Sequence, residues 1–164
     1  MSGKKQDMAK KNAKTAFSLS VQYADTRLKE RISRHKLRHW VAAALQQPAR
    51  LVIRFVDAGE GQMLNKSYRQ KNKATNVLAF VYEDLSPASS SSMPEADIIL
   101  CTDVLEQEAE AQNKTLEAHV AHLVIHGVLH AQGYSHEKKS DAQRMEALET
   151  QIMQRLGFAD PYQQ

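Results

Sequence analysis

The 164-residue sequence lacks the features that stabilise secreted and membrane proteins. It has one cysteine, Cys101, which excludes an intrachain disulfide framework and a cysteine-rich zinc module, so we expect a reducing, cytoplasmic location. No apolar run approaches the roughly 18 residues of a membrane span, and none follows the basic N-terminus, so neither a membrane helix nor a secretory signal is expected. Hydrophobic residues make up 42% and charged residues 25%, a balance that favours a globular domain over a disordered, fibrous or coiled-coil chain.

Charge is unevenly distributed along the chain, although the net charge is only +3. Residues 27–73 carry 12 Lys and Arg against three acids, whereas residues 83–112 carry eight acids and no Lys or Arg. A basic block of this size is typical of a protein that binds a polyanion, most often RNA or DNA. Solvated helix faces would give the same composition, so charge alone leaves both interpretations open.

Hydrophobic periodicity predicts one α+β domain over residues 16–158, between a disordered Lys-rich arm (1–15) and a C-terminal tail (159–164). The expected strands are 17–23, 50–56, 76–82 and 96–101, and the expected helices are 34–46, 60–70, 104–131 and 139–156. This order indicates a single mixed four-stranded sheet packed with helices. Asp103 with Glu106 fits a capping box at the start of the long helix, and Gly133 suits its end. Residues 86–94 are expected to form a polar loop.

The most informative segment runs from His119 to His136. On a helix with about 100° per residue, His119, His122, His126 and His130 form one stripe, and apolar side chains occupy the other sides. A helix that is apolar nearly all round is buried. Buried imidazoles without partners cost a few kcal/mol each, and a metal ion would satisfy them.

The spacing H-x-x-x-H-x-x-G-x-x-H favours one metal site at the end of this helix. His126 and His130 lie one turn apart, and Gly133 allows the chain to turn back so that His136 reaches the same ion. Three imidazoles with an open fourth position are typical of catalytic zinc, one Zn²⁺ per chain, although they also bind Ni²⁺ or Cu²⁺. We interpret His119 and His122 as structural residues of the core, with a contact of His122 to the ligand His126 as the alternative.

Two reactions fit such an ion. Zinc proteases place a Glu directly after the first ligand as the general base, but here that position is Gly127, so a metallopeptidase is disfavoured. An open zinc also acts as a Lewis acid on a phosphoryl oxygen, and a basic surface beside it would dock a phosphodiester backbone. The sequence therefore favours metal-assisted phosphodiester cleavage.

Three motifs carry a family resemblance. They are LNKSYRQKNKATNVLAF at 64–80, ADIILC at 96–101, and HGVLHAQGYSH at 126–136, the last followed by MEALE at 145–149 and LGF at 156–158. In sequence and order they resemble the motifs of the bacterial YbeY-type endoribonucleases, the rRNA maturation factors. The resemblance covers about residues 17–158, which is nearly the whole expected domain.

The resemblance implies a zinc ion held by His126, His130 and His136, and an endoribonuclease specific for single-stranded RNA. It implies work in maturing the 3′ end of small-subunit (16S) rRNA and in ribosome quality control. The implied partners are rRNA and the small ribosomal subunit, and the family suggests a ribosomal protein and an assembly GTPase; neither DNA nor a membrane is expected. Arg69 matches the family's catalytic Arg, whose guanidinium would pair with the scissile phosphate.

Several positions depart from the family pattern. Ser135 stands where the family has Asp before the third His, which removes a candidate proton-handling group. The other departures are Asn72, Ala74, Asn76, Ala79 and Ala96. An alternative hypothesis is a ribosome-assembly binding factor with a structural zinc. Within the nuclease hypothesis, water and a ribose 2′-OH both remain open as the attacking group.

Overall fold

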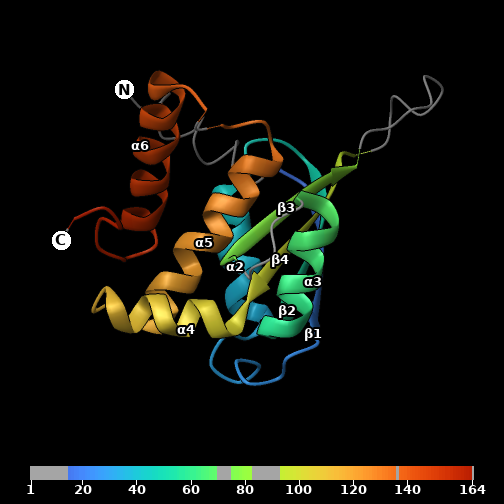
Figure 1. Ribbon diagram of the computed structural model, residues 1–164. Coiled ribbons are helices and arrows are strands. Elements are labelled where there is room, and N and C mark those ends of the chain that lie inside the picture. The colour runs from blue at the N-terminus through green and yellow to red at the C-terminus, as the bar shows by residue number, and fades with distance from the viewer. Residues whose placement is uncertain (1–14, 70–74, 83–92, 136, 164) are drawn as a thin grey trace, which may run out of the picture.

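The computed structural model in Figure 1 describes residues 15–69, 75–82, 93–135 and 137–163. All but one residue of the expected N-terminal arm, most of the expected loop at 86–94, and His136 lie outside these ranges. The elements are β1 (Phe17–Tyr23), α2 (Arg34–Ala44), β2 (Ala49–Val56), α3 (Ala58–Arg69), β3 (Val77–Tyr82), β4 (Glu95–Cys101), α4 (Thr102–Ala111), α5 (Leu116–Ala131) and α6 (Lys139–Arg155). No helix in the described ranges has both the length and the apolar character needed to cross a bilayer.

The four strands form one mixed sheet, as predicted, and their order in the sheet is β1-β2-β4-β3. β1 and β4 both run parallel to β2, and β3 runs antiparallel to β4. The register places Ile53 of β2 between Val21 of β1 and Ile98 of β4. These apolar residues therefore share the face of the sheet on which the core is built.

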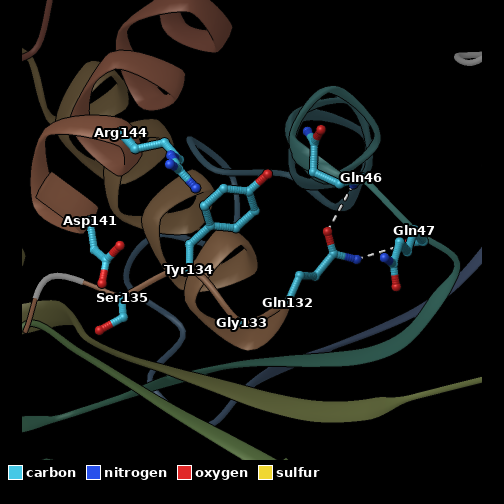
Figure 2. Close-up of a pocket in the computed structure, with 8 residues that line it drawn as sticks. All are labelled: Gln46, Gln47, Gln132, Gly133, Tyr134, Ser135, Asp141 and Arg144. Carbon is cyan, nitrogen blue, oxygen red and sulfur yellow. Dashed lines mark hydrogen bonds between the residues drawn. The ribbon is translucent and has the colours of Figure 1, made fainter.

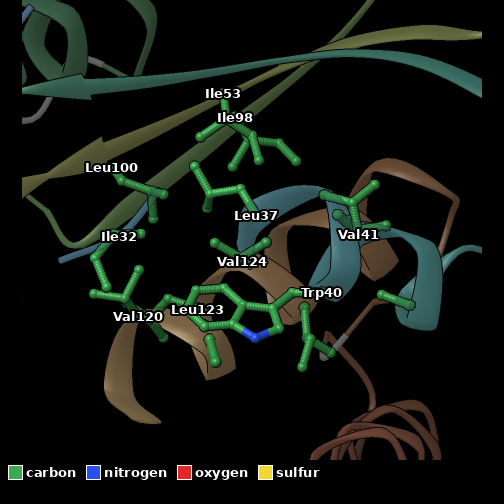
Figure 3. Close-up of a cluster of buried hydrophobic side chains, with 14 of the residues drawn as sticks. Ile32, Leu37, Trp40, Val41, Ile53, Ile98, Leu100, Val120, Leu123 and Val124 are labelled. Atoms are coloured by element: carbon green, nitrogen blue, oxygen red, sulfur yellow. The ribbon is translucent and has the colours of Figure 1, made fainter. Parts of the chain in front are cut away.

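Helices cover the two faces of the sheet unequally. In Figure 1, α2 and α5 pack on one face with α6 outside α5, and α3 lies on the other face. Figure 3 shows the larger core, where α2 and α5 meet the strands; its fully buried members include Leu37, Ile53, Ile98 and Val124. α5 is buried over most of its surface, which agrees with the prediction from its apolar composition.

The single helix predicted over residues 104–131 is wrong. The chain forms α4, then a short turn, then α5. Asn113 in the turn has a φ of 55°, a left-handed conformation that Asn tolerates better than most residues. Thr115 then caps α5, because its side chain accepts a hydrogen bond from the Ala118 N–H at 3.1 Å. Periodicity continued across these two residues, but their local preferences end one helix and begin the next.

The predicted capping box at Asp103 is also wrong, because α4 begins at Thr102 and its N-cap residue makes no side-chain hydrogen bond. The Asp103 carboxylate instead accepts from the Ala58 N–H at 2.7 Å, at the start of α3, and from the Arg27 guanidinium at 2.7 Å. Its negative charge therefore satisfies the N-terminus of a different helix. By contrast, Gly133 ends α5 with a φ of 99°, as predicted.

Candidate functional site

Helix α5 carries four histidines, of which His119 contacts α4 and His122 and His126 contact α6, and their burial decreases along the helix. The exposed fraction of the side chain rises from 4% at His119 to 12% at His122 and 21% at His126. His130, in the last turn, is exposed, so the prediction of a buried helix does not extend to this end. The stripe therefore opens to solvent at the end of α5 where the metal site is predicted.

His119, at the buried end of the stripe, has a carboxylate partner outside the predicted metal site. Its Nε2 lies 2.9 Å from Glu108 Oε1 on α4. The Asn76 side-chain amide donates to the same carboxylate, at 3.2 Å. This arrangement agrees with the interpretation of His119 as a structural residue.

Glu149 on α6 is the residue of this site that the sequence analysis missed. Its side chain is fully buried, and its Oε1 lies 2.8 Å from His126 Nδ1 and 3.2 Å from His122 Nε2. Its Oε2 accepts a hydrogen bond from the Tyr162 hydroxyl at 2.6 Å. The carboxylate on α6 therefore links two imidazoles of α5 with the phenol of the C-terminal segment.

Burial raises the pKa of the Glu149 carboxyl, but hydrogen bonds from His122, His126 and Tyr162 outweigh burial and hold the pKa at about 2. Glu149 is therefore ionised at neutral pH. A signal for it existed in the sequence, because Glu149 shares the apolar face of α6 with Met145 and Ile152. A lone acid on a buried helix face is rarely tolerated without a partner.

His126 and His130 lie one helical turn apart, the spacing that two ligands of a shared ion have in a helix. Their rings lie parallel, with 2° between the planes and 6.5 Å between the centroids. Because His126 Nδ1 bonds Glu149, its Nε2 is the nitrogen that could bind an ion. A carboxylate on the outer nitrogen is the usual arrangement for a metal-ligating His. In donor chemistry and helical spacing, His126 and His130 therefore fit a zinc ion.

The predicted third ligand, His136, lies outside the described residues. Within the residues that are described, no three His, Cys, Asp or Glu side chains come together as a metal site. The structure thus brings His126 and His130 together with Glu149, and the three-His set stays a prediction.

Gly127 follows His126 and faces the sheet. A Cβ built at this position would lie 2.9 Å from Ile98 Cγ2 on β4. A Glu here would point into the core and away from the face that carries His126 and His130. The geometry therefore supports the argument against a metallopeptidase.

The same contact predicts that Gly127→Ala destabilises the protein. Alanine is the better helix former by about 1 kcal/mol, but the overpacking against Ile98 costs about 1–3 kcal/mol. We expect a lower urea midpoint for Gly127→Ala. Gly59→Ala on α3 is the matched control, because its Cβ meets only Asp57 Oδ1 at an ordinary 3.5 Å. A midpoint for Gly127→Ala as high as that of the control would contradict the close packing.

Several cations of the basic block pair with acids of the same chain. Arg50 bonds Glu95 at 2.9 Å across the β2–β4 register, and Arg54 bonds Glu60 at 2.7 Å. Arg27 bonds Asp25 and Asp103. These half-exposed pairs contribute little stability, but they lower the positive charge available to a polyanion.

Arg69, the predicted catalytic residue, is the last residue of α3, and its side chain is outside the described part of the structure.

Comparisons with known proteins agree with the three motifs. A family model described as Endoribonuclease YbeY matches residues 8–157. A protein named Endoribonuclease YbeY from Herminiimonas arsenicoxydans is 59% identical over 148 residues, which is 89% of this chain and 95% of that protein. One of the same name from Janthinobacterium sp. (strain Marseille) is 57% identical over 149 residues, which is 91% of this chain and 96% of that protein.

Among solved structures, the solution structure of a Thermotoga maritima protein is similar, with a TM-score of 0.49 and 22% identity, covering 90% of this chain and 99% of that one. The family assignment itself follows from the sequence matches, which extend over most of the chain and confirm the resemblance. The chain belongs to the endoribonuclease YbeY family, whose name describes the internal cleavage of RNA.

Proposed function

We propose that this protein is a zinc-dependent endoribonuclease that cuts single-stranded RNA, with one Zn²⁺ held by His126, His130 and His136. The observation that carries the proposal is the contact between His126 Nδ1 and the buried, ionised Glu149, at 2.8 Å. It occupies one ring nitrogen and leaves Nε2 as the nitrogen that could bind the ion. Bound zinc would supply Lewis acidity toward a phosphoryl oxygen of the RNA backbone.

The residues of the chain divide the remaining work. Glu149 holds the proton of the His126 imidazole on Nδ1 and keeps the ring in one orientation. His130 is exposed at the end of α5, where a nucleic acid strand could approach. Arg69 is assigned the scissile phosphate, since a guanidinium can pair with two phosphoryl oxygens and stabilise charge that grows in the transition state.

The biological role proposed is maturation of the 3′ end of 16S rRNA, together with ribosome quality control, in the cytoplasm. Its support is the resemblance of the three motifs and the name that the relatives carry. The small ribosomal subunit would be the partner, with a ribosomal protein and an assembly GTPase as further partners.

The test is cleavage of an end-labelled single-stranded RNA fragment spanning the 3′ end of 16S rRNA. We expect the purified protein to cut this strand, to spare it when it is annealed to its complement, and to lose activity with a chelator and regain it with zinc. Product ends would identify the attacking group, since a 2′,3′-cyclic phosphate requires attack by the 2′-OH. Absence of any metal-dependent turnover would overturn the proposal.

A second candidate function is a ribosome-assembly binding factor with a structural zinc. Ser135 favours it, because the family has Asp at that position and Ser cannot act as a carboxylate base. This candidate predicts tight binding to the small subunit with no RNA turnover, and the cleavage experiment separates the two.

For Arg69, charge reversal should slow cleavage without affecting the metal. Arg69→Glu removes a cation from the scissile phosphate, so we expect kcat/KM to fall by about 100-fold while zinc content stays at the wild-type level. Lys66→Glu is the matched control, because Lys66 is an exposed residue one turn earlier on α3. Equal losses in both variants would show that only the general charge of α3 matters.

A further inference from the structure

A polar cavity of about 380 Å³ lies where the end of α2, the turn after α5 and the start of α6 meet (Figure 2). Gln47, Gln132, Tyr134, Ser135, Asp141 and Arg144 line it. Its volume is at the small end of the range for small-molecule sites, so it suits a group of the size of one nucleotide. None of these side chains takes part in the proposed cleavage reaction.

The wall formed by the turn after α5 is held in place by the fold. The Gln132 side chain accepts from the Gln46 N–H at 2.8 Å and donates to the Gln47 carbonyl at 2.8 Å, which ties the turn to the end of α2. Gly133 allows the turn through its left-handed conformation, and the Tyr134 N–H then donates to the Leu129 carbonyl at 3.1 Å. The cavity is therefore preformed and needs little reorganisation to accept a ligand.

The cavity offers the groups that recognise an unpaired base. Figure 2 shows the Tyr134 ring in the middle of the group, between Gln132 and Arg144. Unpaired RNA bases stack on aromatic rings and Arg guanidinium planes, and amide and carboxylate groups bond their polar edges. Asp141 and Arg144 carry opposite charges, so the lining has no net positive charge to hold a phosphate, and this favours a base as the occupant. Within the described residues, the Arg144 guanidinium has no hydrogen-bond or ion-pair partner, so it is available to a ligand.

The cavity adjoins the proposed metal site along the chain. His130 precedes Gln132 by two residues, and Ser135 directly precedes His136. Consecutive Cα atoms are about 3.8 Å apart, so a strand bound at the ion can reach the cavity within one or two nucleotides. We propose that this cavity binds one unpaired base of the RNA substrate, next to the nucleotide that is cut. The inference rests on the proposed function and adds to it a subsite for the substrate.

The test removes the base and the ring separately and then together. Single-stranded RNAs with one abasic ribose, moved position by position, are bound to the full-length chain loaded with zinc, and anisotropy is read before cleavage is detectable on a gel. We expect one abasic position to weaken binding by about 5- to 100-fold, as loss of one stacked base does. Tyr134→Leu, which keeps apolar packing but removes the ring, should weaken binding of intact RNA by a similar factor and abolish the effect of that abasic position.

Arg144→Gln tests the same subsite on the surface of α6, where a folding defect is not expected. It should weaken binding several-fold, whereas Arg155→Gln, the same charge change in the last turn of the same helix, should not. The subsite would be overturned if, at every position, the abasic change weakened binding by the same factor in Tyr134→Leu as in the protein with Tyr134. Equal affinities of Arg144→Gln and Arg155→Gln for RNA would also overturn it. If the wild-type protein cuts no RNA, the proposed function fails instead, so the two failures are distinguishable.

Discussion

His130→Ala is expected to abolish metal-dependent RNA cleavage and leave the fold intact. The imidazole is exposed in the last turn of α5, so its removal creates no cavity in the core. Only two of the three proposed ligands would remain. Loss of a contact to an outer nitrogen already lowers metal affinity by about 10- to 100-fold, so loss of a ligand should cost at least as much. Zinc content by mass spectrometry, initial cleavage rates and urea midpoints measure the three expectations.

The control for His130→Ala is His39→Ala, which removes an exposed imidazole from α2. All three proteins must be purified in parallel, because trace nucleases imitate weak activity. If His130→Ala keeps full zinc occupancy, the ligand assignment is wrong. If it loses zinc but cuts RNA as fast as wild type, the metal is structural and the binding-factor candidate takes precedence.

The strands and helices whose apolar residues repeat with a regular period could be predicted from the sequence. The strand at Phe17–Tyr23 alternates and the α5 stripe repeats every three or four residues, and both lie where expected. The division between α4 and α5 was missed because Asn113 and Thr115 act through their own backbone preferences, which a search for periodicity does not weigh. The fold class was predicted from the order of strands and helices. The turn between α4 and α5 divides one helix into two but does not change that order.

Contacts between distant elements could not be predicted in the same way. The bond from Glu149 to His126 spans 23 residues and depends on how α6 packs on α5. Likewise, the pair of Arg50 and Glu95 depends on the register of β2 against β4, which sequence spacing does not fix. The charge analysis therefore identified a basic block but not how much of it is neutralised internally.

Glu149 should contribute to both stability and metal affinity. Glu149→Ala leaves His122, His126 and the Tyr162 hydroxyl partly buried without their common acceptor. Breaking a buried charged contact by removing one partner costs about 3–5 kcal/mol, so we expect a loss of this size in the free energy of unfolding of the metal-free protein. Urea titration measures it directly, with Glu146→Ala, an exposed acid on the same helix, as the matched control.

Glu149→Gln separates the charge of this residue from its shape. The amide keeps the volume of the side chain and can still accept from one imidazole, so the stability loss should be smaller than for alanine. The negative charge that raises the basicity of His126 is gone, however, so zinc affinity should fall by about 10- to 100-fold. Competition with a chromophoric chelator measures that affinity in the absence of RNA, and Glu146→Gln should bind zinc as wild type does. Equal zinc affinity in Glu149→Gln and Glu146→Gln would mean that Glu149 holds α6 against α5 without acting on the metal site. A buried charge that supports the ion must lower zinc affinity when it is removed, whereas the charge of Glu146 is exposed to solvent.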